Sequence, residues 1–180
     1  MHRPISSFVL VLVALLVALL AAASLTGCDD PITLSELNTR VYATSLSSFR
    51  TQWVREQAAV QHVSTATIER WVTGSPDRLD DGDARGGPWD LSTDLCSFSP
   101  NTGPSFDFRW PCIRHDFAWR NLKRLDAQRS TPVDTRARRL RADEQFLADM
   151  RTTCDLRSGL ARTTCRTVAA TYYQAVVLVS

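Results

Sequence analysis

The feature that most constrains the fold of this 180-residue chain is a set of four cysteines in its C-terminal half. They are Cys96, Cys112, Cys154 and Cys165. Four cysteines allow three disulfide pairings, and we favour Cys96–Cys112 with Cys154–Cys165 because these pairs close two short loops. A bridge over a loop of this size stabilises a fold by about 3 kcal/mol in the chain-entropy view. A zinc site is the alternative, but the chain has no Cys-x-x-Cys pair and one nearby histidine, His115.

The N-terminus has the layout of an export signal. Arg3 precedes an uninterrupted apolar run over residues 8–23, which is shorter than the roughly 20 residues that a transmembrane helix needs. The segment Leu25-Thr26-Gly27-Cys28 follows and resembles a bacterial lipobox. We predict a lipoprotein signal peptide over residues 1–27, a lipid anchor on Cys28, and export to the outer face of the cell membrane. Ordinary secretion or an uncleaved anchor is the alternative, and disulfides persist in an exported protein.

The remainder of the chain is almost neutral. Of the 21 lysines and arginines one is Arg3, which leaves 20 basic residues against 19 acidic ones. No block of basic residues occurs, so we do not expect nucleic acid as a partner. We expect a monomer.

Apolar residues recur at helical spacing after the signal region. Between residues 33 and 57 they lie three to five positions apart, which predicts one amphipathic helix. Thr33 and Glu36 form a capping box at its start. A second helix is predicted over residues 64–73, followed by Gly74 and a proline that end it. We assign residues 28–87 to N-terminal helices and a linker.

Residues 74–111 form a long loop rich in glycine, proline, aspartate and serine. Such long loops are usually functional or disordered, and Cys96 and the aromatic residues within this one, with Cys112 directly after it, favour an ordered, functional loop. Its segment Asp80-Asp81-Gly82-Asp83 lacks the terminal glutamate of an EF-hand, so we expect a solvated turn there. Phe106, Phe108 and Trp110 either contact a bilayer surface, where aromatic rings concentrate, or belong to the core.

Three further helices are predicted over residues 111–124, 134–154 and 160–179. Pro111 suits the first turn of the first helix, where a missing N–H costs nothing. The polar segment around Pro132 is a connection. No strand pattern appears, so the sequence predicts an all-α domain whose helices are clamped by two disulfides.

His115 and Asp116 follow Cys112, just after the long loop, and Asp94 precedes Cys96 within it. Adjacent residues of a helix point about 100° apart, so His115 faces packed protein while Asp116 faces the loop that the first disulfide would bring close. Two carboxylates and the backbone carbonyl of Leu95 then form an oxygen-rich site, which suits Ca²⁺ better than zinc or copper. We predict Asp94, Leu95 and Asp116 as calcium ligands in an ordered metal-binding loop.

Asp143 is the candidate partner of His115. The apolar stripe of the helix over residues 134–154 consists of Leu140, Asp143, Leu147, Met150 and Cys154, so Asp143 occupies a position that should be apolar. A buried carboxylate without a partner is unfavourable. His115 is the favoured partner, and an ion pair with one of the arginines at positions 138, 139 and 141 is the alternative. Asp149 lies off this stripe, and we expect it to be solvated.

These groups imply a hydrolytic mechanism. His115 removes a proton from water, while Asp143 holds the imidazole tautomer and stabilises the imidazolium. The calcium ion polarises an ester carbonyl and stabilises the oxyanion that forms as the water adds. No covalent intermediate is needed, and the sequence has no Gly-x-Ser-x-Gly motif, which disfavours an α/β-hydrolase serine.

Four segments together resemble the secreted prokaryotic phospholipase A2 family over residues 88–180. They are Ser92-Thr93-Asp94-Leu95-Cys96, Cys112-x-Arg114-His115-Asp116-Phe117-x-x-Arg120-Asn121, Asp143-x-x-Phe146-x-x-Asp149-Met150 and Thr171-Tyr172-Tyr173-Gln174-Ala175-Val176. The resemblance implies a small, helical, two-disulfide catalytic region that hydrolyses the sn-2 ester of glycerophospholipids at a membrane surface. By this likeness the catalytic base is His115 with Asp143 as its partner, and the calcium ligands are Asp94, the Leu95 carbonyl and Asp116.

Two parts of this interpretation have alternatives: the assignment of Asp143 as the partner of His115, and the catalytic function itself. The connection before Asp143 is longer than is usual in the family, with an insertion near residues 128–136, so Asp134 and Asp149 are alternatives for its role. A non-catalytic calcium- or lipid-binding module on the same scaffold would bind vesicles without turnover. A zinc-stabilised structural domain would contain metal and four reduced thiols.

Overall fold

The computed structural model describes residues 32–79, 87–97 and 99–180, which belong to one compact unit, Pro31–Ser180. The predicted signal peptide, Cys28 and the predicted turn at residues 80–83 lie outside the described residues. Six α-helices make up nearly all regular structure in the described part, which confirms the all-α prediction. None of these helices is long and apolar enough to cross a membrane.

The N-terminal half contains α2 (Leu34–Tyr42), α3 (Leu46–Val60), α4 (Thr65–Gly74) and the short 3₁₀ helix η1 (Pro76–Leu79). The capping box of Thr33 and Glu36 is confirmed. The prediction of one helix over residues 33–57 is wrong, because the chain leaves the helical path between α2 and α3. There the side chain of Ser45 accepts the N–H of Ser48 and begins α3. Serine and threonine compete with helical backbone bonds in this way.

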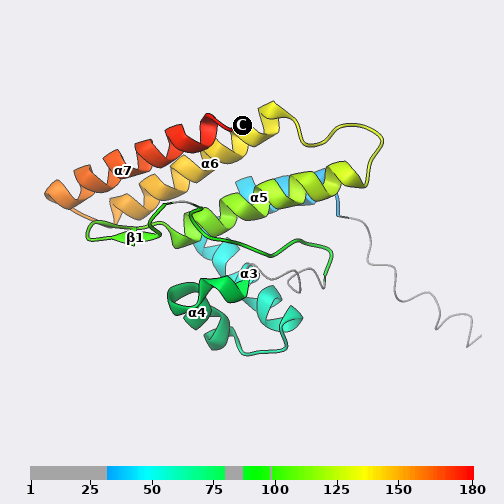
Figure 1. Ribbon diagram of the computed structural model, residues 1–180, viewed down its shortest axis with the longest axis horizontal. Coiled ribbons are helices and arrows are strands. Elements are labelled where there is room, and N and C mark those ends of the chain that lie inside the picture. The colour runs from blue at the N-terminus through cyan, green and yellow to red at the C-terminus, as the bar shows by residue number, and fades with distance from the viewer. Residues whose placement is uncertain (1–31, 80–86, 98) are drawn as a thin grey trace, which may run out of the picture. The chain divides into compact units, whose positions relative to one another are not determined.

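A small antiparallel hairpin, β1 (Thr102–Gly103) and β2 (Phe106–Asp107), precedes the C-terminal helices. Its strands are two residues long, too short for a sequence pattern. The helices that follow are α5 (Arg109–Ala127), α6 (Arg136–Asp155) and α7 (Gly159–Val177). α6 and α7 lie side by side as an antiparallel pair, and α5 packs on α6 (Figure 1).

Both predicted disulfides are present. The Cys96–Cys112 bridge ties the long loop to α5, and the Cys154–Cys165 bridge joins α6 to α7. The pairing prediction is therefore confirmed. Four cysteines engaged in disulfides cannot serve as thiolate ligands, which argues against the zinc alternative.

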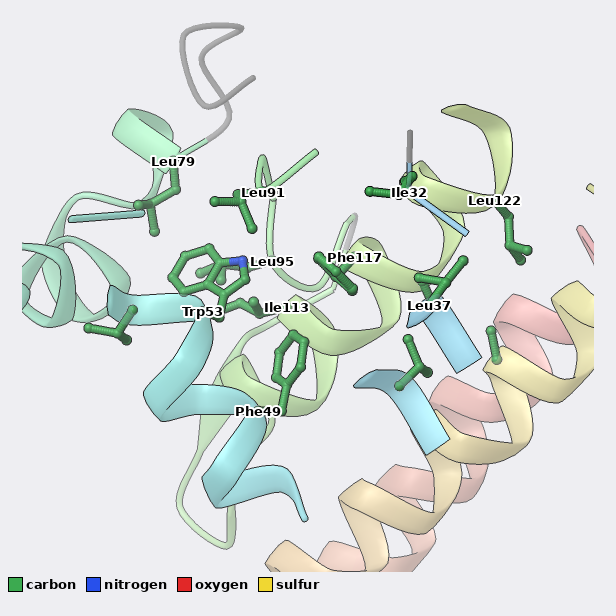
Figure 2. Close-up of a cluster of buried hydrophobic side chains, with 14 of the residues drawn as sticks. Ile32, Leu37, Phe49, Trp53, Leu79, Leu91, Leu95, Ile113, Phe117 and Leu122 are labelled. Carbon is green, nitrogen blue, oxygen red and sulfur yellow. The ribbon is translucent and has the colours of Figure 1, made fainter. Parts of the chain in front are cut away.

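The larger of two hydrophobic clusters lies between α2, α3 and α5. Phe49 and Trp53 of α3 pack against Ile113 and Phe117 of α5, as Figure 2 shows. The smaller cluster surrounds both disulfides and consists of Cys96, Phe108, Cys112, Phe146, Met150, Cys154, Cys165 and Ala169. Both clusters lie in the compact unit of residues 31–180, so this unit holds the apolar burial that a domain needs to fold alone.

Phe106, Phe108 and Trp110 of the long loop pack within or against these clusters. Phe108 is fully buried, and its ring lies 4.8 Å from that of Phe106 and 5.6 Å from that of Tyr172. Trp110 packs edge-on against Trp53, with ring centroids 5.9 Å apart. Phe108 is therefore a core residue, and Phe106 and Trp110 are half-buried residues packed against the core.

Asp149 is buried, which contradicts the prediction that it is solvated. It has 4% exposure, and its two carboxylate oxygens accept hydrogen bonds from Arg114 at 2.7 and 2.5 Å. Arg114, on α5, also donates to the carbonyl of Thr44 at 2.8 Å, just before α3. The pair thus connects α5, α6 and the break between α2 and α3, a role that helical spacing within α6 could not reveal.

Candidate active site

The loop over residues 90–97 is fixed against two helices. Gln57 of α3, fully buried, donates to the carbonyl of Leu91 at 2.8 Å. Asn121 of α5, also fully buried, both accepts the N–H of Asp90 at 2.9 Å and donates to its carbonyl at 2.8 Å. With the Cys96–Cys112 disulfide, these bonds hold the loop along α5 and against α3.

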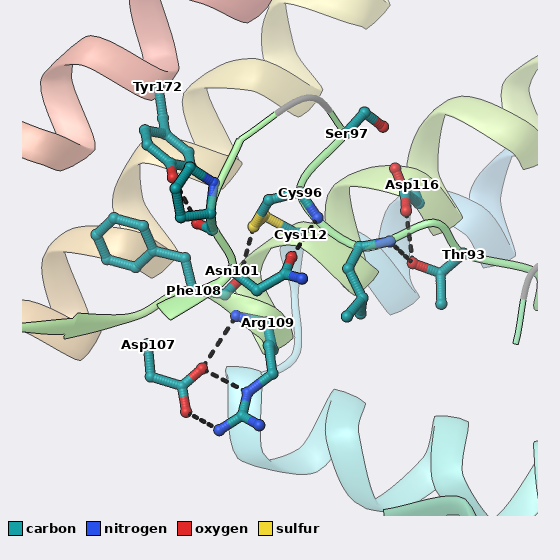
Figure 3. Close-up of a disulfide and its surroundings, with 12 residues drawn as sticks. Thr93, Cys96, Ser97, Asn101, Asp107, Phe108, Arg109, Cys112, Asp116 and Tyr172 are labelled. Carbon is teal, nitrogen blue, oxygen red and sulfur yellow. Dashed lines mark hydrogen bonds and ion pairs between the residues drawn. A yellow bond between two sulfur atoms is a disulfide. The ribbon is translucent and has the colours of Figure 1, made fainter. Parts of the chain in front are cut away.

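Thr93 connects the loop to Asp116. Its buried hydroxyl donates to the Asp116 carboxylate at 2.5 Å and accepts the N–H of Leu95 at 3.0 Å, as Figure 3 shows. Leu95 has a φ of 60°, a left-handed conformation that is uncommon outside glycine. The bend at Leu95 and the bond to Thr93 bring the predicted ligands of the loop to the same end of α5 as Asp116.

The two acidic side chains, Asp94 and Asp116, lie in different electrostatic environments. Burial, with the nearby negative charge of Asp94, raises the pKa of Asp116 to about 8, although the Thr93 hydrogen bond and Arg120 act in the opposite direction. Burial also acts to raise the pKa of Asp94, but hydrogen bonds from Ser97 and Arg120 outweigh it and hold that pKa below its ordinary value. Arg120 donates to Asp94 at 2.7 Å and to Ser92 at 2.6 Å.

A metal site of three or more His, Cys, Asp or Glu side chains does not occur among the described residues. The predicted set contains two such side chains, Asp94 and Asp116, and takes its third oxygen from the backbone of Leu95. Oxygen ligands of this mixed kind are those that Ca²⁺ accepts.

His115 and Asp143 are in contact. The His115 Nε2 lies 2.7 Å from Oδ1 of Asp143, whose side chain is fully buried. The indole N–H of Trp119 donates to the same oxygen at 3.2 Å, and the hydroxyl of Ser180 donates to the other one. The His115 ring also stacks on Phe146 at a centroid distance of 4.7 Å.

The alternative partners considered for these residues are engaged elsewhere. Asp149 binds Arg114, and Asp134 pairs with Arg139 at 3.6 Å. Neither carboxylate therefore replaces Asp143, and Asp143 forms no ion pair with an arginine among the bonds described.

A pocket of about 610 Å³ opens beside His115 and Asp116. Its walls come from the long loop and from α5, α6 and α7, and they include Leu95, His115, Asp116, Trp119, Arg120, Lys123, Phe146, Tyr172, Val176 and Val179. This volume is typical of a small-molecule site. The pocket thus has an imidazole and a carboxylate on one side and apolar side chains on the other.

His115 and Asp143, which the sequence pairs, are in contact, and Asp116 lies against the loop. Several neighbours of these residues have contacts that the sequence did not predict. Thr93, Arg120 and Asn121 lie inside the quoted motifs, Thr93 next to Asp94 and the other two four and five positions after Asp116, so their position was a usable clue. Trp119, four residues after His115, shares its helix face. Ser180 lies far along the chain from Asp143, and no pattern connects them.

Comparison with known proteins shows the family of the chain. A family model described as prokaryotic phospholipase A2 matches residues 65–180, which is more than half of the chain. The chain belongs to this family. Among curated proteins, a secretory phospholipase A2 from Arthroderma benhamiae is 38% identical over 87 residues, 47% of this chain and 55% of that protein. The chain therefore matches about half the length of this relative.

The match to the prokaryotic phospholipase A2 family begins within the N-terminal half, at α4, and runs through α7. It therefore includes both disulfides, the loop over residues 90–97 and every wall of the pocket.

Proposed function

We propose that the protein hydrolyses the sn-2 ester of glycerophospholipids in a calcium-dependent reaction and releases a fatty acid and a lysophospholipid. The observation that carries the proposal is the imidazole of His115 in the pocket wall, hydrogen-bonded through Nε2 to the fully buried carboxylate of Asp143. Membership of a phospholipase A2 family supports the substrate class.

His115 is the proposed general base. With Nε2 directed at Asp143, that nitrogen carries the proton of the neutral ring, and Nδ1 keeps a lone pair. A water molecule in the pocket would give its proton to Nδ1 as its oxygen attacks the ester carbonyl, and the buried carboxylate would stabilise the imidazolium. The same ring would then return the proton to the leaving glycerol oxygen, so no covalent intermediate forms.

Asp94, Asp116 and the carbonyl oxygen of Leu95 are the proposed Ca²⁺ ligands. Their arrangement fits such an ion, because Asp94 lies near enough for its charge to raise the pKa of Asp116, and a cation would neutralise both. A bound calcium ion would polarise the ester carbonyl and stabilise its oxyanion. Thr93 positions both Asp116 and the backbone of Leu95.

The apolar side of the pocket suits an acyl chain. Phe146 of α6 and Val176 of α7 line the same space as His115. Arg120 and Lys123 line the pocket on α5, where their positive charge complements a phospholipid phosphate.

We also propose that the protein is exported, with a signal peptide over residues 1–27 and a lipid anchor on Cys28. The name of its secretory relative and the two disulfides support export. In this proposal residues 28–87 provide N-terminal helices and a linker, and residues 88–180 provide the catalytic region.

The function is tested by fatty acid release from phospholipid vesicles labelled in the sn-2 chain. We expect labelled fatty acid and unlabelled lysophospholipid with calcium, and no release after addition of a chelator. Release that continues in chelator would contradict the calcium role. Vesicle binding without any release would instead support the non-catalytic module.

Two substitutions near the proposed calcium ligands are expected to have opposite effects on calcium affinity. Thr93→Val keeps the side-chain volume but removes the bonds to Asp116 and Leu95, and loss of such an outer partner weakens metal binding by about 10- to 100-fold. Arg120→Gln removes a cation that pairs with Asp94, so calcium should bind up to about fivefold more tightly. Isothermal titration calorimetry measures both; a change in the same direction would argue against the assigned ligands.

Trp119→Phe and Ser180→Ala are each expected to lower kcat/KM by about tenfold. Each removes one hydrogen bond to the charged Asp143 while leaving most of the side-chain packing in place. Hydrolysis of a soluble short-chain phospholipid checks the rates, and thermal unfolding checks that the fold is kept. Full activity of the double variant would mean that Asp143 needs no partner besides His115.

A further inference from the structure

A second pocket, of about 470 Å³, lies at the connection between α5 and α6. This connection is the loop that leaves the right-hand end of α5 in Figure 1. Among the described residues, the pocket shares no wall with the one beside His115. It therefore plays no part in the hydrolysis proposed above.

The walls of the second pocket come mainly from one segment of the chain. This is the polar stretch near residues 128–136, which the sequence predicts to be an insertion relative to the phospholipase A2 family. The first residue of α2, Leu34, completes the walls. The reaction common to the family does not depend on an inserted segment, so a pocket built from it points to a property beyond that reaction.

The connection is held in a fixed shape by its own hydrogen bonds. One carboxylate oxygen of Asp126 accepts the N–H of Val133 at 2.6 Å and that of Asp134 at 3.1 Å. The guanidinium of Arg138 donates to the carbonyl of Val133 at 2.7 Å, and Val133 itself is buried. Pro132 fixes the backbone angle φ just before it. A segment shaped in this way binds a ligand without the ordering cost of a flexible one.

The side chains in the pocket wall are hydrogen-bond donors. Arg129 and Arg138 supply two guanidinium groups, and Ser130 and Thr131 supply two exposed hydroxyls. None of the described residues that line the pocket is acidic. Within the described part of the chain, the side chains of Arg129, Ser130 and Thr131 form no hydrogen bond or ion pair. Guanidinium and hydroxyl donors around one space match the oxygens of a phosphate group.

The charge at this corner of the molecule is positive. Of the two neighbouring acids, Asp126 is bonded to the backbone of the connection, and Asp134 pairs with Arg139 at 3.6 Å. Arg129 and Arg138 form no ion pair in the part of the chain that the structure describes. The first turn of α6 also contains no acidic residue. Arginine there opposes the positive end of the helix dipole, so the stability of α6 does not account for Arg138, whereas a bound anion does.

The volume of the pocket indicates more than a bare phosphate ion. A space of about 470 Å³ is within the range of sites for small organic molecules. The half-buried side chain of Leu34 and the ring of Pro132 form an apolar part of the wall. The phosphate oxygens would thus face the arginines and hydroxyls, while the group that carries the phosphate would lie against the apolar part.

We infer that this pocket binds a phosphomonoester, with Arg129 and Arg138 on the phosphate oxygens. A small soluble molecule and the headgroup of phosphatidic acid both carry such a group. The inference does not rest on the proposed function, because no residue of the pocket takes part in the proposed hydrolysis.

The test is isothermal titration calorimetry of the protein with glycerol 3-phosphate, in chelator so that no calcium phosphate forms. We expect one saturable site, and Arg129→Gln should weaken the affinity at least about tenfold, because a hydrogen bond to a charged group is lost. Arg136→Gln is the matched control: it removes the same charge from an exposed position of the same corner, outside the pocket wall, and should change the affinity far less. Inorganic phosphate should bind more weakly than the ester, because it leaves the apolar wall uncovered.

Arg138→Gln should also weaken binding, and thermal unfolding separates this effect from a loosened connection. The source of the phosphate group is identified with dihexanoyl phosphatidic acid below its aggregation concentration. Tighter binding of this lipid than of glycerol 3-phosphate, again dependent on Arg129, assigns the pocket to a headgroup, and the reverse order assigns it to a soluble ester.

Two results would overturn the inference. One is the absence of saturable binding of either ester. The other is binding that survives Arg129→Gln but is lost in Lys123→Gln, which would place the phosphate in the pocket beside His115. The titration has no catalytic readout, so its result is the same whether or not the protein hydrolyses phospholipids.

Discussion

Replacing His115 by glutamine is expected to lower the rate of fatty acid release by about 10³-fold, the typical contribution of a positioned general base. Glutamine can still donate a hydrogen bond to Asp143 from the place that Nε2 occupies, so the fold and the pocket should remain. It cannot accept and return a proton. Release of labelled fatty acid from vesicles with saturating calcium measures the effect.

Two controls make this result specific. His62→Asn changes an exposed histidine in the turn after α3 and should leave the rate unchanged. Calcium affinity of the His115→Gln protein should equal that of the wild type, because His115 is not among the proposed ligands. A His115→Gln protein that retains a tenth of the activity would contradict the proposed mechanism.

Replacing Arg114 by methionine is expected to destabilise the protein by about 3–5 kcal/mol, the usual effect of removing one partner of a buried ion pair. Arg114 and Asp149 are 2% and 4% exposed, so the substitution leaves a carboxylate buried without its cation. The arginine also satisfies the carbonyl of Thr44. Denaturant unfolding followed by circular dichroism gives the change in free energy.

The double variant Arg114→Met/Asp149→Leu is the matched control for this effect. Two apolar residues of similar volume leave no buried charge, so most of the lost stability should return. If the double variant is as unstable as Arg114→Met, the loss stems from the packing of the α5–α6 contact or from the Thr44 carbonyl. The Arg114–Asp149 ion pair would then contribute little to the free energy of unfolding.

Much of the site followed from the sequence because its residues break local patterns. Asp143 was recognisable as an acid on an apolar stripe, and its contact with His115 is present at 2.7 Å. The disulfides followed from the short spacing of neighbouring cysteines, and both pairs are present. Periodicity also located α4 to α7 within a few residues of their ends.

The features that sequence reasoning missed depend on contacts between distant segments. Asp149 looked solvated because spacing within α6 says nothing about Arg114 on the facing helix. The break between α2 and α3 depends on a local competition for hydrogen bonds at Ser45 that apolar spacing does not record. Ser180 reaches Asp143 only because α6 and α7 are paired.

The bridge between Cys96 and Cys112 has a consequence for the timing of assembly. It is the covalent link between α5 and the segment that carries Asp94 and Leu95. A chain whose thiols are still reduced holds that segment by hydrogen bonds alone. On the proposed function, a newly made molecule therefore has its lowest activity in the reducing cytoplasm, where the lipids of the producing cell are close. It becomes fully active when the disulfide forms in an oxidising environment outside the cytoplasm.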